Sequence, residues 1–591
     1  MKLCVLALDY DGTIAHNDRP DSSVLDAIGD ARRRGIKVLL VTGRILAELR
    51  RVAGSLRFVD AVVAENGAVV HFPDTGHTTT LAQPMHPAFA ARLSEIGISF
   101  QVGECLIDAD ASSAPQMLDI IHDLQLPIVL LFNRSRLMAL PQGVSKATGL
   151  NAALTMLRAS PRNTLSIGDA ENDHELLRLA EIGAAVEWGS PSLQAAADVV
   201  ITGSGPSAVG EFITRTAAGG RLPAPIRARR RLLLGRTEDG REFSLAVRGR
   251  NMLITGETNS GKSWLAGLLC EQLILQGYSL CVIDPEGDYR TLETLPGVAV
   301  LGGEDLPPTP RELLHALRYP DRSVVIDLSS MEHGRKFEYI RSVLPALNVM
   351  RRRTGVPHRL VVDEAHYFLH DAFARELLDL ELNGYTVVTY WPSKLPADLV
   401  AATEVILVTR ESNAQEIEAL RERCATCQHL DTSGWEVLPA LRLDQAAALP
   451  GAREANGHLQ IFTIGERLTP HVRHRQKYVD VPVTDSRAFV FATRRGASVR
   501  AHTLREFVAA LESLDVSHAD AYLRRGDFAR WIGDVFGDHA LAKELEGHER
   551  RYLLANHDDV LDQIVAAISS RYDLADDEQD DDRSIDHLTR L

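Results

Sequence analysis

The sequence has little of what marks membrane, disulfide-rich or fibrous proteins. It contains only six cysteines in 591 residues, and aromatic residues make up just 6% of the chain. Its longest apolar runs, such as residues 126–132, are far shorter than the roughly 20 residues that cross a bilayer. The opening MKLCVLALDYDGT has one lysine and a short apolar run that acids follow at once. We therefore expect a cytoplasmic protein without membrane segments.

The cysteines do not predict a metal centre. Cys424 and Cys427, with His429 after them, are closely spaced, but a structural zinc site usually needs a second such pair, which the sequence lacks. Ordinary reduced thiols are the simpler interpretation.

Positive charge is also scarce. The chain has 64 Lys and Arg against 80 Asp and Glu, a formal net charge of −16, so attraction of the whole surface to nucleic acid is not expected. Residues 573–591 hold eight of the acids and two arginines, which predicts a disordered acidic tail. Arginines at 227–231 and 351–353 leave local basic clusters on the folded part.

The pattern of strands and helices predicts several α/β units. At roughly 150 residues per domain, a chain of this length and ordinary apolar content forms about four domains. Two long stretches alternate short apolar strands with amphipathic helices, which is typical of parallel α/β sheets. We predict an α/β domain at 1–215 with an inserted segment at about 83–141, a linker at 216–231, a second α/β domain at 232–480, a mostly helical domain at 486–572 and the tail at 573–591.

Four motifs in the first stretch carry chemistry. They are Asp9-Tyr10-Asp11-Gly12-Thr13 after the strand 3–8, Thr42-Gly43-Arg44 after the strand 36–41, Gly143-Val144-Ser145-Lys146 before a helix, and Gly168-Asp169-Ala170-Glu171-Asn172-Asp173 after the strand 164–167. Open α/β sheets bind ligands at the carboxyl ends of their strands. Each motif alone could be a turn or a helix cap, but the four in this order predict an active site.

This arrangement resembles the haloacid dehalogenase (HAD) phosphatases, in particular their Cof-type branch. The branch likeness rests on Glu65-Asn66-Gly67-Ala68 and on the inserted segment, which stands where Cof-type members carry an α/β cap. The resemblance implies a Rossmann-like domain with a small α/β cap. It assigns the nucleophile to Asp9, the general acid–base to Asp11, a phosphoryl hydrogen bond to Thr42 and charge neutralisation to Lys146. It also implies Mg²⁺ held by Asp9, the Asp11 backbone carbonyl and Asp169, with Asp173 close by.

The substrate is less defined. A cap of about sixty residues favours a small phosphate ester, such as phosphoglycolate or a sugar phosphate, over a polymer. A degenerate domain that only binds its ligand is the alternative to an active phosphatase.

A second candidate site follows the strand 251–255. The motif GETNSGKS at 256–263 has the spacing G-x-x-x-x-G-K-S, with a strand before it and a helix after it, as a phosphate-binding loop requires. The predicted ATP-binding residues are Gly256, Thr258, Asn259, Ser260, Gly261, Lys262 and Ser263, and Ser263 would also ligate Mg²⁺. After the strand 359–362, Asp363 would support that ion and Glu364 would polarise the attacking water.

The second stretch, with a hairpin expected around Asp239-Gly240, resembles the HerA/FtsK group of ring-forming ATPases. The likeness implies a RecA-like fold and a homo-oligomer, typically a hexamer in this group, in which an arginine of a neighbouring subunit completes each ATP site. Arg410 and the run 351–353 are the candidates. Tyr390-Trp391 stands where the group usually carries a polar pair, which puts translocation in doubt more than ATP binding.

The leading interpretation is a bifunctional protein, a Mg²⁺-dependent phosphatase for a small ester fused to an ATP-binding and ATP-hydrolysing ring domain. One alternative is a nucleic-acid-processing machine of defence or repair, with DNA as partner, DNA-stimulated ATP hydrolysis and a phosphatase for nucleotides or ends. Another is a metabolic phosphatase in which ATP only assembles or switches the ring.

Overall fold

The computed structural model describes most of the chain. It covers residues 1–591 except 134, 227, 248–249, 259, 370–375, 424–431, 450–458, 471–482, 484, 486, 493–497, 537–538, 556–558 and 573–591. The cysteine pair near position 425 and the acidic tail predicted at the end of the chain lie outside the described residues.

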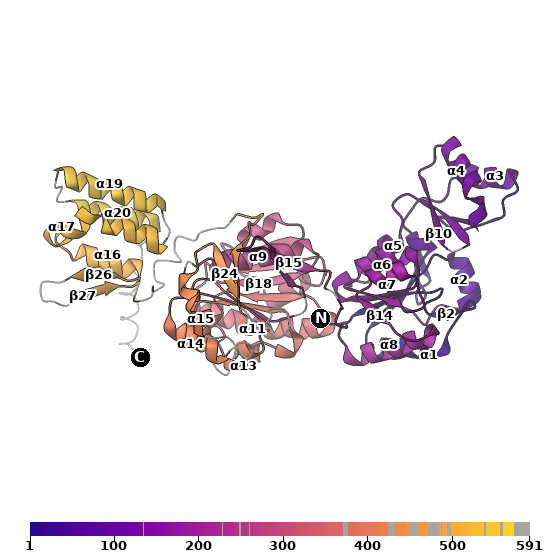
Figure 1. The fold of residues 1–591 in the computed structure, drawn as a ribbon, viewed down its shortest axis with the longest axis horizontal. Coiled ribbons are helices and arrows are strands. Elements are labelled where there is room, and N and C mark those ends of the chain that lie inside the picture. The colour runs from indigo at the N-terminus through magenta and orange to yellow at the C-terminus, as the bar shows by residue number, and fades with distance from the viewer. Residues whose placement is uncertain are drawn as a thin grey trace, which may run out of the picture.

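The first sheet has eight strands in the order β14-β13-β12-β1-β4-β5-β6-β7 (Figure 1). It is parallel from β14 to β5, whereas β6 and β7 run antiparallel. Its strands are β1 (Val5–Asp9), β4 (Lys37–Val41), β5 (Ala61–Ala64), β6 (Val69–Phe72), β7 (His77–Thr80), β12 (Thr164–Gly168), β13 (Ile182–Val186) and β14 (Val199–Ile201).

Helices cover both faces of this sheet. Leu6 and Leu8 of β1 pack into the core shared with α1 and α8, while Val5 and Ala7 pack against α5 and α6. Because successive side chains of a strand point to opposite faces, burial on both sides requires the uninterrupted apolar run. The helices are α1 (Ser22–Arg33), α2 (Leu46–Ala53), α5 (Lys146–Met156), α6 (His174–Leu179), α7 (Pro191–Ala196) and α8 (Gly205–Gly219), and a short ribbon joins β2 (Ala15–His16) to β3 (Arg19–Pro20).

A separate four-stranded antiparallel sheet stands beyond this domain, in the order β10-β11-β9-β8 (Figure 1). Two helices pack on one of its faces through an apolar core that includes Phe89, Met117 and Leu137. The elements are α3 (Pro87–Glu95), β8 (Phe100–Val102), β9 (Ile107–Asp110), α4 (Ala114–Asp123), β10 (Ile128–Asn133) and β11 (Arg136–Pro141). We call this unit the cap.

The second large sheet has eleven strands in the order β16-β15-β25-β24-β23-β17-β22-β21-β18-β20-β19. The strands from β23 to β19 are parallel, and the rest are antiparallel. They are β15 (Arg231–Thr237), β16 (Glu242–Ala246), β17 (Met252–Thr255), β18 (Leu280–Asp284), β19 (Val298–Gly302), β20 (Ser323–Asp327), β21 (Arg359–Val362), β22 (Tyr385–Thr389), β23 (Val405–Val408), β24 (Gln445–Ala448) and β25 (Gln460–Ile464). The hairpin predicted around Asp239-Gly240 is confirmed as β15–β16.

This sheet is also buried on both faces. Met252 and Ile254 of β17 join the core under α9, and Leu253 joins the opposite core under α11. The helices of this part are α9 (Lys262–Leu275), α10 (Pro310–Ala316), α11 (His333–Thr354), α13 (Ala397–Ala401), α14 (Ala414–Arg423) and α15 (Thr432–Glu436).

The C-terminal region is mostly helical, around one hairpin and an aromatic core that contains Phe489, Phe507 and Phe528. Its elements are β26 (Phe489–Ala492), β27 (Ser498–Ala501), α16 (Leu504–Glu512), α17 (Val516–Arg525), α18 (Asp527–Trp531), α19 (His539–Ala555) and α20 (Val560–Tyr572). The predicted fold class, two α/β parts followed by a helical region, is confirmed. Within the described residues, no helix is both long and apolar enough to cross a membrane.

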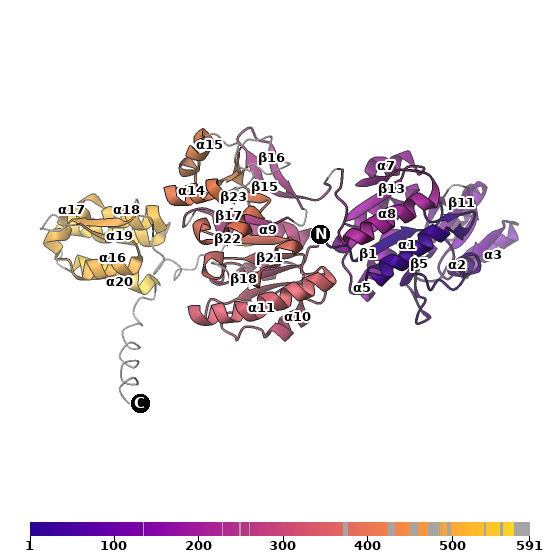
Figure 2. The same cartoon turned by 90° about the horizontal axis from the view of Figure 1, so that it is seen from below.

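The two large sheets meet at the beginnings of their strands (Figure 2). Asn163, just before β12, contacts His358, just before β21, with 3.1 Å between Oδ1 and Nε2. Ser279, just before β18, donates its N–H to the other ring nitrogen of His358 at 2.8 Å. Because the strands run away from this contact, their carboxyl ends lie on opposite sides of the interface.

Candidate functional sites

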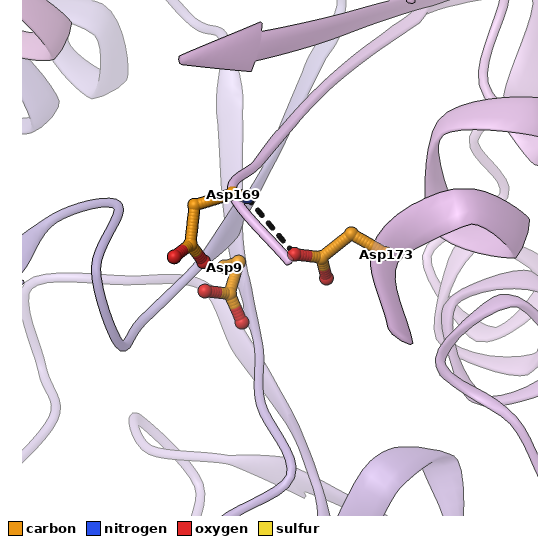
Figure 3. A group of neighbouring side chains, drawn as sticks. All are labelled: Asp9, Asp169 and Asp173. Atoms are coloured by element: carbon orange, nitrogen blue, oxygen red, sulfur yellow. Dashed lines mark hydrogen bonds between the residues drawn. The ribbon is translucent and has the colours of Figure 1, made fainter. Parts of the chain in front are cut away.

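Three buried carboxylates meet at the carboxyl ends of β1 and β12. Asp9 ends β1, Asp169 follows β12, and Asp173 ends the 3₁₀ turn η4 (Glu171–Asp173). Each offers one oxygen, and these oxygens all lie within 4.8 Å of one another (Figure 3). The parallel pairing of β1 with β12 brings together residues that are 160 positions apart in the sequence.

Lys146 is the positive charge of this cluster. Its buried ammonium donates to Asp9 Oδ1 and to Asp173 Oδ1, at 2.6 Å each. Burial alone would lower the pKa of Lys146, but Asp173 and Asp9 outweigh burial and raise that pKa above its usual value. Burial, helped by Asp173 and Asp169, raises the pKa of Asp9 well above its usual value, although Lys146 opposes this shift.

The charge of the cluster suits a hard divalent cation. The cluster holds three carboxylates and one ammonium, so negative charge is in excess, and Asp173 and Asp169 add to the rise in the pKa of Asp9 that burial causes. A closely packed set of carboxylate oxygens is the donor set that Mg²⁺ prefers in proteins. The residues present therefore fit the ion that the sequence implies.

Glycines allow the close approaches that position this cluster. A Cβ on Gly168 would lie 2.6 Å from the Asp173 carboxyl, which instead accepts the N–H groups of Asp169 and Ala170 at 3.0 and 3.1 Å. A Cβ on Gly67 would lie 1.9 Å from the carbonyl oxygen of Ser145. Ser145 caps α5 and immediately precedes Lys146, so the turn at Gly67 sets where that helix begins.

Thr42 and Asp11 take different positions around the cluster. Asp9 pairs with Val41 across β1 and β4, so Thr42 is one residue beyond the nucleophile position on the neighbouring strand. The Asp11 carboxylate instead faces Arg44, whose Nε and Nη2 donate to its two oxygens at 2.8 and 2.6 Å. No contact between Asp11 and the other carboxylates is found among the described residues.

Arg44 is a site residue to which the sequence assigned no role. Besides Asp11, its guanidinium contacts Asp18 and Glu48, the latter at 3.5 Å. The hydrogen bonds that Arg44 donates to Asp11 outweigh burial and raise the pKa of Arg44 above its usual value. Its position directly after Thr42-Gly43 could have indicated a site residue, but nothing in the spacing of the motifs shows which carboxylate it binds.

The cap lies over this edge of the sheet. A Cβ on Gly43 would lie 3.1 Å from the Met138 sulfur of β11. Glu65 is fully buried and accepts the cap N–H groups of Glu104 and Cys105 at 2.9 and 2.8 Å. The Glu65-Asn66-Gly67 turn therefore contacts both the helix that carries Lys146 and the cap.

The second predicted site lies between β17 and α9. Gly256 and Gly261 have φ values of 146° and 96°. A residue with a side chain would be strained in this backbone conformation. Ser260 donates its hydroxyl to the carbonyl of Glu257 at 2.6 Å, and Lys262 donates to the same carbonyl at 2.8 Å. Gly256, Thr258, Ser263 and the rest of the loop follow the strand as predicted, except that Asn259 lies outside the described residues.

Asp363 and Glu364 follow β21, which lies one strand away from β17, with β22 between them. Both carboxylates are buried, and Glu364 has a left-handed backbone with φ 44°. Tyr390, just after β22, contacts both His366, which follows these acids in the sequence, and Lys262 of the loop. The Tyr390 ring centroid lies 4.3 Å from that of His366 and 5.8 Å from the Lys262 ammonium.

Three of the four arginines proposed for a neighbouring subunit, Arg410, Arg351 and Arg352, are engaged within this chain. Arg410 follows β23, and its Nε donates to Glu257 Oε1 of the loop at 2.6 Å. Arg351 is buried and donates to the carbonyls of Pro357 and Asn383. Arg352 pairs with Asp379. The run at 351–353 is therefore a weaker candidate for a contact between subunits than its charge suggests.

Comparisons with known proteins match both parts of the chain. Residues 6–117 and 99–213 match the model of the haloacid dehalogenase-like hydrolases, and residues 242–353 match that of the central domain of the helicase HerA. A phosphoglycolate phosphatase of Natronomonas pharaonis is 30% identical over 210 residues, which cover 34% of this chain and 91% of that protein. One of Methanothermobacter thermautotrophicus is 26% identical over 231 residues, 36% and 97% of the respective chains.

Solved structures give matches over the same part. A haloacid dehalogenase-like hydrolase from Bacteroides thetaiotaomicron is 17% identical, with a TM-score of 0.33, and the match covers 36% of this chain and 99% of that one.

Proposed function

Because residues 6–213 belong to the haloacid dehalogenase-like hydrolases and are followed by a HerA-type central domain, we propose a bifunctional protein. Its first domain would be a Mg²⁺-dependent phosphatase for a small phosphate ester, and its second would bind and hydrolyse ATP. The observation that carries the first proposal is the buried cluster of Asp9, Asp169 and Asp173, two of which, Asp9 and Asp173, bind Lys146. The second rests on the phosphate-binding loop between β17 and α9.

The phosphatase reaction would proceed in two steps. An oxygen of Asp9 attacks the phosphorus, the bond to the ester oxygen breaks, and Asp11 gives its proton to the leaving alkoxide. Water then attacks the aspartyl-phosphate, the Asp11 carboxylate accepts the water's proton, and phosphate leaves with Asp9 restored. Thr42 would donate to a phosphoryl oxygen, and Lys146 would balance the charge of the transferring group.

Asp9, Asp169 and the Asp11 backbone carbonyl would hold Mg²⁺, with Asp173 nearby. The ion would offset repulsion between the carboxylates and the phosphate and would orient the phosphoryl group. Lys146 donates to Asp9 and Asp173 in the structure, so it holds the carboxylate of the proposed nucleophile in place.

The substrate proposed is phosphoglycolate or a similar small ester, because relatives named phosphoglycolate phosphatases align with most of their own length. The test measures phosphate release from a panel of phosphoglycolate, sugar phosphates and nucleotides. It uses Lys262→Ala, so that ATP hydrolysis adds no signal, and Lys262→Ala with Asp9→Asn as the blank. Asp9-dependent release from one small ester supports the proposal. Equal release with and without Asp9 from every compound would sink it.

In the second domain, Lys262 would contact the β- and γ-phosphates of ATP, and Ser263 and Asp363 would hold Mg²⁺. Glu364 would polarise the attacking water. The remaining predicted loop residues, Gly256, Thr258, Asn259, Ser260 and Gly261, would bind phosphate through backbone N–H groups. The likeness to HerA supports a homo-oligomeric ring, proposed as a hexamer, which mass photometry with and without ATP would test.

A second candidate function is nucleic-acid processing, which the match to the central domain of a helicase favours. Duplex DNA would then stimulate ATP hydrolysis by the full chain. Ring assembly without such stimulation would favour an ATP-switched phosphatase instead.

A further inference from the structure

A cavity of about 620 Å³ lies between the phosphate-binding loop and the C-terminal region. One wall comes from the ATPase part, with Glu257 of the loop, Arg410 and Ser412. The other comes from the C-terminal region and includes Arg487 and Val490. Sequence reasoning assigned no chemistry to that region, and Arg487 is 229 positions from the nearest loop residue it touches.

Arg487 connects the two walls. Its Nη1 donates to the carbonyl of Thr258 at 3.3 Å and lies 3.5 Å from Glu257 Oε1. Its Nη2 donates to the carbonyl of Asp534 at 3.1 Å, and its own carbonyl accepts the indole N–H of Trp531 at 2.8 Å. Desolvation by burial lowers the pKa of this guanidinium, although Glu257 opposes the shift. The C-terminal region thus holds a partly buried cation against the rim of the loop.

The phosphates of a bound nucleotide have one clear place. They would lie at the N-terminus of α9, beside Lys262, where backbone N–H groups point outward. On the β22 side, Tyr390 lies against Lys262, 5.8 Å from its ammonium, and packs on His366. Glu257, whose carbonyl binds Lys262, forms part of the cavity wall on the other side. The rest of the nucleotide therefore has space toward the cavity.

The lining suits a flat polar group and not another polyanion. It contains three arginines and three acids, so its charges cancel, and several are already paired. Arg410 binds Glu257 at 2.6 Å, and Arg530 lies 3.4 Å from Asp527. Aromatic side chains, Phe489, Tyr522 and Trp531, complete the far wall. Mixed polar groups on an aromatic background are what a ribose and a base require.

We propose that this cavity binds the nucleoside part of the nucleotide whose phosphates occupy the loop, and that Arg487 makes the C-terminal region a component of the ATP site. The inference rests on the proposed ATP binding and goes beyond it, because it gives the C-terminal region a function. ATP and ADP then depend on this region for affinity, whereas inorganic tripolyphosphate, which has no nucleoside, does not.

The test compares binding of ATP, ADP and tripolyphosphate to the full chain by calorimetry. Val490→Trp fills the cavity from an exposed position on β26 and removes no hydrogen bond. Val499→Trp is the matched control, since Val499 is similarly exposed on the paired strand β27 and does not line the cavity. We expect Val490→Trp to weaken ATP and ADP binding by about tenfold or more, with tripolyphosphate unchanged and Val499→Trp like the wild type.

Arg487→Gln is an independent test, because it removes the guanidinium without filling the cavity. Arg500→Gln on β27 is its control. Arg487→Gln is expected to weaken ATP and ADP and to spare tripolyphosphate. Wild-type affinity of both Val490→Trp and Arg487→Gln for ATP would overturn the inference, and so would an equal loss for tripolyphosphate. If Lys262→Ala binds ATP as tightly as the wild type, the proposed loop site fails first and this inference falls with it.

Discussion

At the scale of single residues, Arg44 controls where the proposed general acid points. The Asp11 carboxylate makes a two-pronged pair with this guanidinium and is not part of the close group of Asp9, Asp169 and Asp173. For the proposed reaction, Asp11 must reach the leaving oxygen of a substrate. Arg44 would therefore act as a positioning residue, holding Asp11 in one rotamer until a substrate draws it inward.

Replacing Arg44 tests this role. Arg44→Gln is expected to lower kcat about tenfold for phosphoglycolate, whose alkoxide needs a proton, and much less for p-nitrophenyl phosphate, whose leaving group does not. Phosphate release from the two substrates gives the comparison, and Arg34→Gln, at the exposed residue that follows α1, is the control. An equal loss on both substrates would show that Arg44 supports the fold or binding instead of Asp11.

Glu411 is a second residue whose state matters. It is buried next to the loop, and burial raises its pKa to about 7. The negative charges of Glu257 and Glu416 also raise this pKa, whereas the positive charge of Lys262 lowers it. The ionised form of Glu411 would repel the phosphates of ATP, so bound ATP raises this pKa further and binding takes up a proton. ATP affinity should then fall as pH rises above about 7.

The linkage predicts a loss of up to about tenfold in ATP affinity between pH 6.5 and 8.5 for the wild type. Glu411→Gln, which stays neutral, should show a flatter profile and tighter binding at pH 8.5. Calorimetric titrations at both pH values provide the measurement, and changes in the protonation of ATP itself are common to both proteins. Parallel profiles would contradict the assignment.

At the scale of elements, the sequence predicts where the strands with functional residues end. It predicts the contacts between those strand ends only in part. The uninterrupted apolar run before Asp9 predicts a strand that is buried on both faces, and the strand before Asp169, which also contains Thr164 and Ser166, is recognised with the help of the motif after it. The contact of Asp11 with Arg44 and the packing of Tyr390 on His366 join residues that are distant in the sequence. No local pattern shows that these residues are neighbours in the fold. The contact of Arg487 with the loop depends on how two regions pack, which no local pattern encodes.

The turn at Gly67 packs closely against α5, the helix that begins with Lys146, and this contact fixes the position of Lys146. A Cβ on Gly149 would lie 2.5 Å from the Gly67 Cα and 2.7 Å from its carbonyl oxygen. Gly149→Ala should therefore push α5 away from the sheet, lower stability by about 1–3 kcal/mol and reduce phosphatase kcat.

Gly29→Ala is the matched control in another helix of the same domain. Its Cβ would meet only the end of the Arg33 side chain at 3.5 Å, so this change should be neutral or stabilising by about 0.5–1 kcal/mol. Urea unfolding and phosphate release check both variants. Equal stability of the two would contradict the account of the Gly67 contact.

At the scale of the whole molecule, the two α/β parts are joined through buried groups. His358 contacts Asn163 and Ser279, and burial lowers its pKa from 6.5 to about 3, helped by Arg162 and Arg351. The carboxyl ends of both sheets, where the two proposed sites lie, point away from this contact. Other contacts also join the two parts, such as the hydrogen bond from the Tyr278 hydroxyl to Glu181 at 2.9 Å.

The lowered pKa of His358 makes the stability of the folded chain depend on pH. The unfolded chain binds a proton near pH 6.5 and the folded chain does not until about pH 3, so stability is full above 6.5 and is lost as pH falls toward 3. The loss is about 1.4 kcal/mol per pH unit, or about 2 kcal/mol between pH 6.5 and 5. His358→Gln, which does not titrate, should lower stability at pH 7 and reduce the slope. Urea midpoints at pH 7 and 5 measure this, and an unchanged slope would place its origin elsewhere.

The central claim is that one chain carries two separate hydrolytic sites, and a crossed comparison of two variants tests it most directly. Phosphate release from phosphoglycolate and from ATP is measured for the wild type, Asp9→Asn and Lys262→Ala. The account predicts that Asp9→Asn loses phosphoglycolate hydrolysis by at least about a thousandfold and keeps ATP hydrolysis, whereas Lys262→Ala does the reverse. Phosphoglycolate and ATP turnover that rise and fall together in both variants would contradict it.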